Sequence, residues 1–184
     1  MNKIVKKTQF SEKVFKLEVE APMIAKARKA GHFVIIRVGE KGERVPLTIA
    51  GSDIEKGTIT LVVQTVGAST SRLCALNEGD YITDVVGPLG RATHIENFGT
   101  VVCAGGGVGV APMLPIIQAL KAAGNRVISV LAGRSKELII LEDEVRKSSD
   151  EVIIMTDDGS YGKQGVVTVG IEEVIQREKV NKVF

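Results

Sequence analysis

The chain has 184 residues, of which 44% are apolar and 25% charged, the balance of a globular protein with room for one large domain or two small ones. Its 24 basic and 22 acidic residues are scattered and give a net charge of +2, which argues against nucleic acid or a membrane as partner. The two cysteines, Cys74 and Cys103, lie too far apart for a disulfide framework or a four-ligand metal site. No apolar segment follows the basic N-terminus, so we expect no signal peptide and a cytoplasmic protein.

Up to about residue 86 the pattern is one of short alternating strands separated by turn residues. The strand-like runs are VFKLEVE, FVIIRV, GTITLVVQTV and DYITDVV, and the turns between them include KGER, EKG and NEGD. This pattern of short strands and turns predicts an antiparallel β-barrel or sandwich.

Beyond GPLG, at 87–90, strands and helices alternate. Strand-like TVVCAGG, RVISVLAG, EVIIMTDD and KVF are separated by helical patterns at about 112–123, LEDEVRKS and GIEEVIQR. A βαβ series of this kind predicts a parallel sheet, so we place a first domain at 1–96 and a second, α/β domain at 97–184.

The stretch CAGGGVGVAP, Cys103 to Pro112, has four glycines in five positions directly before a predicted helix. A helix N-terminus carries unpaired N–H groups and a partial positive charge, and glycine lets a phosphate approach the backbone, so Gly105 to Gly109 is a candidate phosphate cradle. The spacing is neither G-x-G-x-x-G nor that of a Walker P-loop. The alternative is a tight βα turn that uses glycine only for packing.

The barrel half carries a second group of candidate residues. ERVPLTIAG, at 43–51, is followed by VVQTVGASTSRL, at 62–73, in which Gly67, Ser69 and Thr70 open a short helix. The two hydroxyls there either cap the helix or bind phosphate.

Taken in order, R-x-P-L-T, G-x-S-T, GPLG, GGGVGxAP and TDDGSYGxxG resemble the flavoproteins of the ferredoxin reductase superfamily. Within it, the chain is most similar to FAD- and NAD-binding electron-transfer subunits of the reduced ferredoxin:NADP oxidoreductase, sulfide dehydrogenase and dihydroorotate dehydrogenase type. The resemblance covers nearly all 184 residues. It implies a flavin-binding β-barrel domain followed by a nucleotide-binding α/β domain.

The resemblance also implies roles for individual residues. Thr48 would lie near flavin N5, and Gly67, Ser69 and Thr70 would hold the FAD pyrophosphate. The other residues assigned to FAD are Arg44, Val45, Pro46, Leu47, Val62, Val63 and Gln64. Those assigned to the nicotinamide dinucleotide and its surroundings are Gly106, Gly107, Gly109, Gly133, Arg134, Asp157, Asp158, Gly159 and Gly162.

Arg44 departs from the superfamily pattern, because it precedes Thr48 by four residues where three are usual. On an extended strand this offset puts the side chain on the other face, so a role at the pyrophosphate requires a bulge.

Hydride transfer between a nicotinamide and a flavin needs two rings held in contact, and the cofactors perform the bond making. No catalytic triad is required, which fits a chain with two histidines, His32 and His94, neither beside a nucleophile. Asp157 and Asp158 at the end of a strand are typical of turn chemistry.

KVNKVF looks like the start of a further parallel strand, so we expect the chain to be truncated. The resemblance implies that a longer protein binds a 2Fe-2S cluster through cysteines absent here, and passes electrons to a larger catalytic subunit, with ferredoxin as another partner. Alternatives are a stand-alone NAD(P)H flavin reductase and a non-enzymatic dinucleotide-binding regulatory module. The resemblance favours NAD(H), although Gly133, Arg134 and Ser135 also suit the 2′-phosphate of NADP(H).

Overall fold

The computed structural model describes residues 1–184, which divide into two units, Met1–Thr93 and His94–Phe184. Each unit has its own apolar core, the first around Leu17, Ile49 and Leu61 and the second around Ile128 and Val130.

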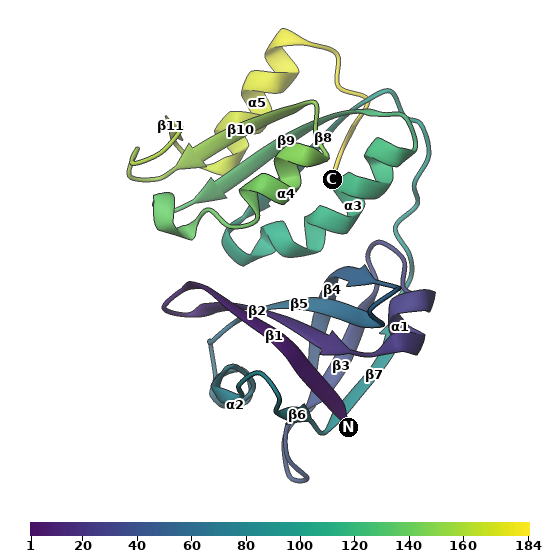
Figure 1. The fold of residues 1–184 in the computed structure, drawn as a ribbon. Helices are drawn as coiled ribbons and strands as arrows, with labels where there is room; N and C mark the ends of the chain where they lie inside the picture. The colour runs from purple at the N-terminus through teal and green to yellow at the C-terminus, as the bar shows by residue number, and fades with distance from the viewer. The chain divides into compact units, whose positions relative to one another are not determined.

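The first unit is a seven-stranded antiparallel sheet in the order β6-β1-β2-β5-β4-β3-β7. The two outermost strands, β6 and β7, are separated in the chain by Thr83 alone, so the sheet curls round into a barrel (Figure 1). This confirms the antiparallel barrel predicted from the alternating runs. Its elements are β1 (Asn2–Ser11), β2 (Val14–Glu20), α1 (Pro22–Ala27), β3 (Phe33–Arg37), β4 (Val45–Asp53), β5 (Thr58–Gln64), α2 (Ala68–Ala75), β6 (Tyr81–Ile82) and β7 (Asp84–Leu89).

Lys7 on β1 ties the short helix α2 to the barrel. Its ammonium donates hydrogen bonds to the carbonyl oxygens of Cys74 and Leu76, at 2.6 and 2.7 Å. The last carbonyls of a helix have no partner within the helix and carry partial negative charge, so a lysine there satisfies both needs. The opposite end of α2, which holds candidate site residues, is thereby fixed against the sheet.

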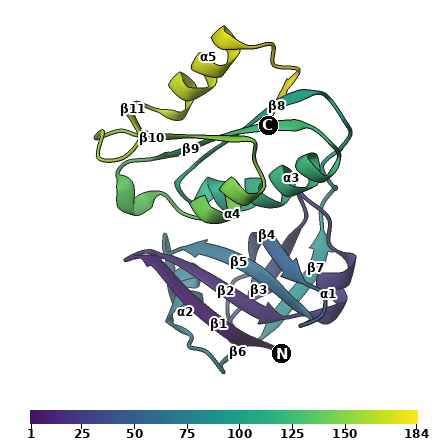
Figure 2. The same cartoon turned by 45° about the horizontal axis from the view of Figure 1, so that its top comes forward.

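The second unit is a five-stranded parallel sheet in the order β11-β10-β9-β8-β12. Helices α3 and α4 cover one face of it and α5 the other (Figures 1 and 2), which confirms the predicted α/β architecture. Its elements are β8 (Thr100–Gly106), the 3-10 turn η1 (Gly107–Gly109), α3 (Val110–Ala122), β9 (Arg126–Gly133), the 3-10 turn η2 (Lys136–Leu138), α4 (Glu142–Lys147), β10 (Glu151–Thr156), β11 (Lys163–Gln164), α5 (Val167–Arg177) and β12 (Lys182–Val183).

The strand order reverses at β8. From β8 the chain proceeds outward to β9 and β10, and α5 then returns it to β12 on the other side of β8. In open α/β sheets, ligands bind outside the carboxyl ends of the strands where the order reverses. That position is occupied here by the glycine turn 105–109.

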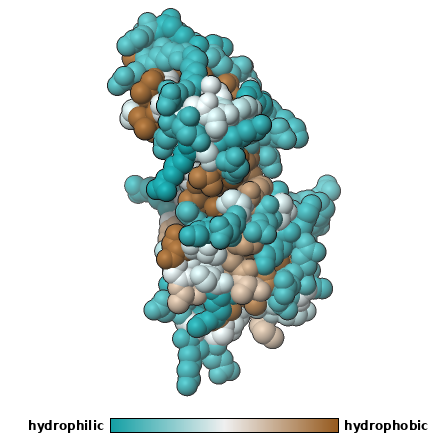
Figure 3. Space-filling model, turned by 90° about the vertical axis from the view of Figure 1, so that its left-hand side faces the viewer, coloured by the Kyte–Doolittle hydropathy of each residue, from teal (hydrophilic) through white to brown (hydrophobic).

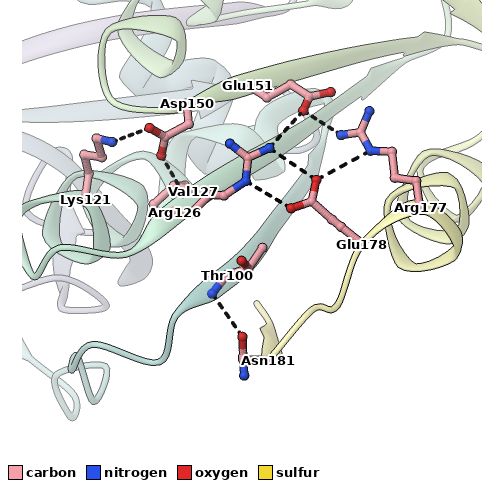
Figure 4. A network of polar contacts seen from close by, with 9 residues as sticks. All are labelled: Thr100, Lys121, Arg126, Val127, Asp150, Glu151, Arg177, Glu178 and Asn181. Atoms are coloured by element: carbon pink, nitrogen blue, oxygen red, sulfur yellow. Dashed lines mark hydrogen bonds and ion pairs between the residues drawn. The ribbon is translucent and has the colours of Figure 1, made fainter.

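Charged side chains tie the opposite, amino edge of this sheet together (Figure 4). Arg126 at the start of β9 binds Glu178 with two hydrogen bonds of 3.0 and 3.2 Å, and Arg177 binds Glu151 at 2.6 Å. Asp150 accepts hydrogen bonds from Lys121 Nζ and the Val127 N–H, which lower the pKa of its carboxyl. These charges join the C-terminal end of α5 to the strand starts and are satisfied by one another.

No helix is long and apolar enough to cross a membrane. The most exposed apolar side chains, Met1, Met23 and Val66, come from different parts of the sequence. On the face drawn in Figure 3, apolar residues show as separate patches among hydrophilic ones.

Candidate functional site

The four glycines of 105–109 serve different purposes. A Cβ on Gly105 would lie 3.1 Å from the Gly109 carbonyl oxygen and 3.1 Å from Val110 Cα, so this glycine is needed for close packing. Gly107 has φ +51°, a conformation that favours glycine. Neither packing nor backbone conformation requires glycine at position 109, because its φ is −64° and a Cβ there would meet no atom within 4 Å. A Cβ on Gly106 would make only ordinary contacts, at 3.8 Å or more. Gly106 and Gly109 therefore lack a side chain although close packing does not require glycine at either position.

The bare backbone lies at the start of α3, a helix of 13 residues. No side chain caps that helix, and its first turn contains no acidic residue. Its partial positive charge is thus not neutralised by the protein. Together with the strand reversal at β8, this arrangement suits the phosphates of a dinucleotide.

The loops that follow β9 and β10 are bound to each other. The N–H groups of Asp157 and Asp158 donate to the carbonyl oxygens of Gly133 and Arg134, at 3.1 and 3.2 Å. The Asp158 carboxylate accepts hydrogen bonds from the hydroxyl and N–H of Ser160, at 2.6 and 2.9 Å, which lower its pKa. Asp158 therefore has the turn-forming role that a DDG sequence suggests.

Three glycines of these loops have reasons within the fold. A Cβ on Gly133 would press on Ile139 and the backbone of residue 138, and one on Gly162 would overlap the Ile154 carbonyl oxygen. Gly159 and Gly162 both have positive φ, +71° and +68°. The side chains of Arg134 and Asp157 are exposed and form no hydrogen bond or ion pair. Of the residues predicted in these loops, those two have side chains free to meet a ligand.

In the barrel, alternation divides the predicted flavin residues between two faces. Val45, Leu47, Ile49 and Val63 pack on the barrel core, so their side chains point inward. The alternate positions on the neighbouring strands β4 and β5 face outward. These outward positions are Pro46, Thr48, Val62 and Gln64, of which Val62 is buried, with 8% of its surface exposed.

The start of α2 has bare backbone too. Gly67 is extended, with φ −163°, and a Cβ there would meet no atom within 4 Å. The Thr70 hydroxyl accepts hydrogen bonds from the N–H groups of Val66 and Gly67, at 3.0 and 3.1 Å, so Thr70 forms the cap. The Ser69 hydroxyl instead donates to the Glu43 carboxylate at 2.8 Å. Glu43 was not among the predicted residues, because nothing in the sequence shows that it reaches α2.

Arg44 lies just before β4, with its guanidinium 3.4 Å from the Asp84 carboxylate. The pairing of β3 with β4 is regular from Val45 to Thr48, so no bulge re-aims this part of the chain. The irregularity in β4 comes later, between Ile49 and Gly51. The bulge that a pyrophosphate role for Arg44 requires is therefore absent between Arg44 and Thr48.

Cys74 and Cys103 are buried. Burial raises the pKa of Cys74 to about 11 and that of Cys103 to about 12, so both thiols stay protonated at neutral pH. We expect a neutral-pH thiol reagent to leave the native chain unlabelled over an hour and to label both cysteines once the chain is unfolded. Rapid labelling of the folded protein would contradict this burial.

An open cavity of about 340 Å³ lies along the free edge of β10, lined by Glu151 to Ile154 and by charged residues of α4 and α5. It begins at the amino end of β10, away from the glycine turn, and Gly162 is the one predicted residue on its wall. Its Lys163 and Arg177 are paired with Glu173 and Glu151. Paired charges along an exposed strand edge protect it from other strands.

Comparison with known proteins identifies the family. No protein-family model matches the chain. The dihydroorotate dehydrogenase B (NAD(+)) electron transfer subunit of Streptococcus pneumoniae is 32% identical over 177 residues, which are 94% of this chain and 68% of that protein. The chain belongs to this family of electron transfer subunits. A family homologue from Thermotoga maritima is 46% identical over 179 residues, 97% of this chain.

Solved structures agree with this family assignment. The NADH-dependent reduced ferredoxin-NADP oxidoreductase, described as a flavin-based electron bifurcating protein, matches with 43% identity and a TM-score of 0.92, over 97% of this chain and 64% of that one. An Amycolatopsis cytochrome P450 reductase, 20% identical with a TM-score of 0.80, shares the fold. The chain spans 63% of the Thermotoga maritima family member, less than two thirds of its length.

Proposed function

We propose that this chain is the FAD- and nicotinamide-dinucleotide-binding part of an electron-transfer oxidoreductase. The observation that carries the proposal is the bare backbone at the starts of α2 and α3, where Gly67, Gly106 and Gly109 leave room that the fold does not use. Family membership supports it, since a homologue is named as an electron transfer subunit.

The barrel residues fit a flavin. The N-terminal N–H groups of α2 and the Ser69 hydroxyl would hold the FAD pyrophosphate at the uncovered backbone of Gly67, and the phosphate would have to displace Glu43 from Ser69. Pro46, Thr48 and Gln64 would present an outward surface to the ring and ribityl chain, whereas Val62 is buried and would offer little of it. Bound FAD would supply the hydride-accepting chemistry, so the protein needs to contribute position and exclusion of water.

The α/β unit fits the dinucleotide. Gly106, Gly107 and Gly109 would hold its phosphates against the start of α3, and Arg134 and Asp157 would lie beside its adenosine half. Gly133, Gly159 and Gly162 would shape the loops and support these contacts indirectly. We assign Arg44 no contact with FAD, because its guanidinium lies beside Asp84.

We further propose that the protein is cytoplasmic and that it works with a larger catalytic subunit; the second proposal is supported by relatives that are named electron transfer subunits. In the longer protein a 2Fe-2S cluster would connect the flavin to that subunit or to ferredoxin. Neither the cluster nor a metal is assigned to residues of this chain.

The visible spectrum tests the proposal. After incubation with FAD and gel filtration, we expect a yellow protein that absorbs at about 450 nm and bleaches anaerobically with NADH or NADPH. A colourless protein that refuses FAD but binds a dinucleotide would overturn the redox role in favour of a regulatory module. Purification of the full-length protein as a single active species would favour a stand-alone flavin reductase over a subunit.

A further inference from the structure

The loop after β9 carries a carboxylate at the dinucleotide edge of the sheet. Glu137 lies in η2, four residues beyond the end of β9. A dinucleotide whose phosphates rest at the turn after the first strand places its adenosine ribose at the end of the second. Here the second strand is β9, so Glu137 lies in the loop that would receive the ribose.

Hydrogen bonds fix this carboxylate. The Ser135 hydroxyl donates to Glu137 at 2.6 Å, which lowers the pKa of Glu137 and keeps it ionised at neutral pH. The Lys136 N–H donates to the Ser160 hydroxyl at 2.9 Å, and that hydroxyl donates to Asp158 at 2.6 Å. The loop after β9 is therefore bound to the loop after β10. The negative charge of Asp158 opposes the effect of Ser135 and raises the pKa of Glu137, but it is a smaller influence.

Glu137 forms no ion pair, although the charge of the neighbouring Lys136 lowers the pKa of its carboxyl. Lys136 Nζ lies over the Tyr161 ring, 5.4 Å from its centroid. Arg134 is exposed and forms no ion pair. The two loops therefore carry two cations and three carboxylates, those of Glu137, Asp157 and Asp158, so their side chains have a net negative charge.

We propose that Glu137 is the residue that selects NAD(H) over NADP(H). Its carboxylate accepts a hydrogen bond from a hydroxyl of the adenosine ribose and repels the 2′-phosphate that NADP(H) carries in its place. The inference rests on the proposed function and deepens it by naming the residue that selects its dinucleotide.

Calorimetric titration of the flavin-loaded protein with NAD+ and NADP+ tests this, because it measures binding without turnover. The variant is Glu137→Gln, and the control is Asp143→Asn, an exposed acid on α4. We expect the wild type to bind NAD+ at least about tenfold more tightly than NADP+, and Glu137→Gln to reduce that ratio about fivefold or more. Asp143→Asn should leave the ratio unchanged.

Two results would overturn the inference alone: equal affinity of the wild type for both nucleotides, or the same ratio in Glu137→Gln as in Asp143→Asn. Failure of both nucleotides to bind would refute the dinucleotide site of the proposed function and this inference with it. Glu137 is exposed, so we expect its variant to fold.

Discussion

Replacing Gly109 with alanine is expected to weaken dinucleotide binding at least about tenfold while changing the free energy of unfolding by less than about 1 kcal/mol. The new methyl group would enter space where no protein atom lies within 4 Å, and the backbone at Gly109 is already helical. It would occupy the place that we assign to a phosphate. Calorimetric titration with NAD+ and urea unfolding measure the two effects.

Gly105→Ala is the matched control, and we expect it to lower stability, which Gly109→Ala should leave nearly unchanged. Its Cβ would lie 3.1 to 3.2 Å from three backbone atoms of residues 109 and 110, so we expect a loss of about 1–3 kcal/mol in the free energy of unfolding. If Gly109→Ala bound NAD+ as tightly as the wild type, the glycines would serve packing alone and the dinucleotide site would be wrong.

Replacing Asn125 with alanine is expected to cost about 2–4 kcal/mol of stability. This side chain is 2% exposed and satisfies three backbone groups. Its Oδ1 accepts from the Phe98 N–H at 2.7 Å, and its Nδ2 donates to the carbonyl oxygens of Glu96 and Leu120, both at 2.8 Å. Alanine would leave a cavity and remove the partner of the Phe98 N–H and the Glu96 carbonyl oxygen, while the Leu120 carbonyl oxygen would keep the N–H of residue 125 at 3.2 Å. Urea unfolding monitored by circular dichroism measures the loss.

Asn97 provides the comparison, since it is a nearby asparagine that is exposed. It accepts one hydrogen bond from the Gly99 N–H at 3.0 Å and donates a long one, 3.4 Å, to the Gly124 carbonyl oxygen. Water can replace both, so Asn97→Ala should cost less than about 1 kcal/mol. Equal losses in the two variants would mean that the burial of Asn125 contributes nothing.

The strands that the sequence predicted best are those whose alternation survives in the fold. β2 keeps Leu17 and Val19 buried, and the parallel strands β8 and β9 are buried along most of their length. β1 was not predicted, because Ile4 is its one buried residue and its pairing with β2 shifts register twice. Helix α1 has six residues, too few to show a helical period.

For the candidate site, the sequence located the glycine-rich segments but not the purpose of each glycine. Gly105 and Gly109 differ only in what surrounds the missing Cβ, which depends on the folded backbone. The same limit applies to Glu43 and Glu137, whose hydrogen bonds with Ser69 and Ser135 are known only from the structure. The predicted assignments of individual residues to FAD and dinucleotide remain proposals.

The parallel sheet has two chemically distinct rims. Arginines and glutamates satisfy one another at the rim where Arg126 meets Glu178, whereas the glycine rim has unfilled space at Gly106 and Gly109. Substitutions among these ion pairs would therefore change stability at one rim without altering the glycine turn at the other. On the glycine rim, a side chain can be added at little cost in folding energy only where the surroundings are open, as at Gly106 and Gly109, whereas Gly105 is confined by backbone.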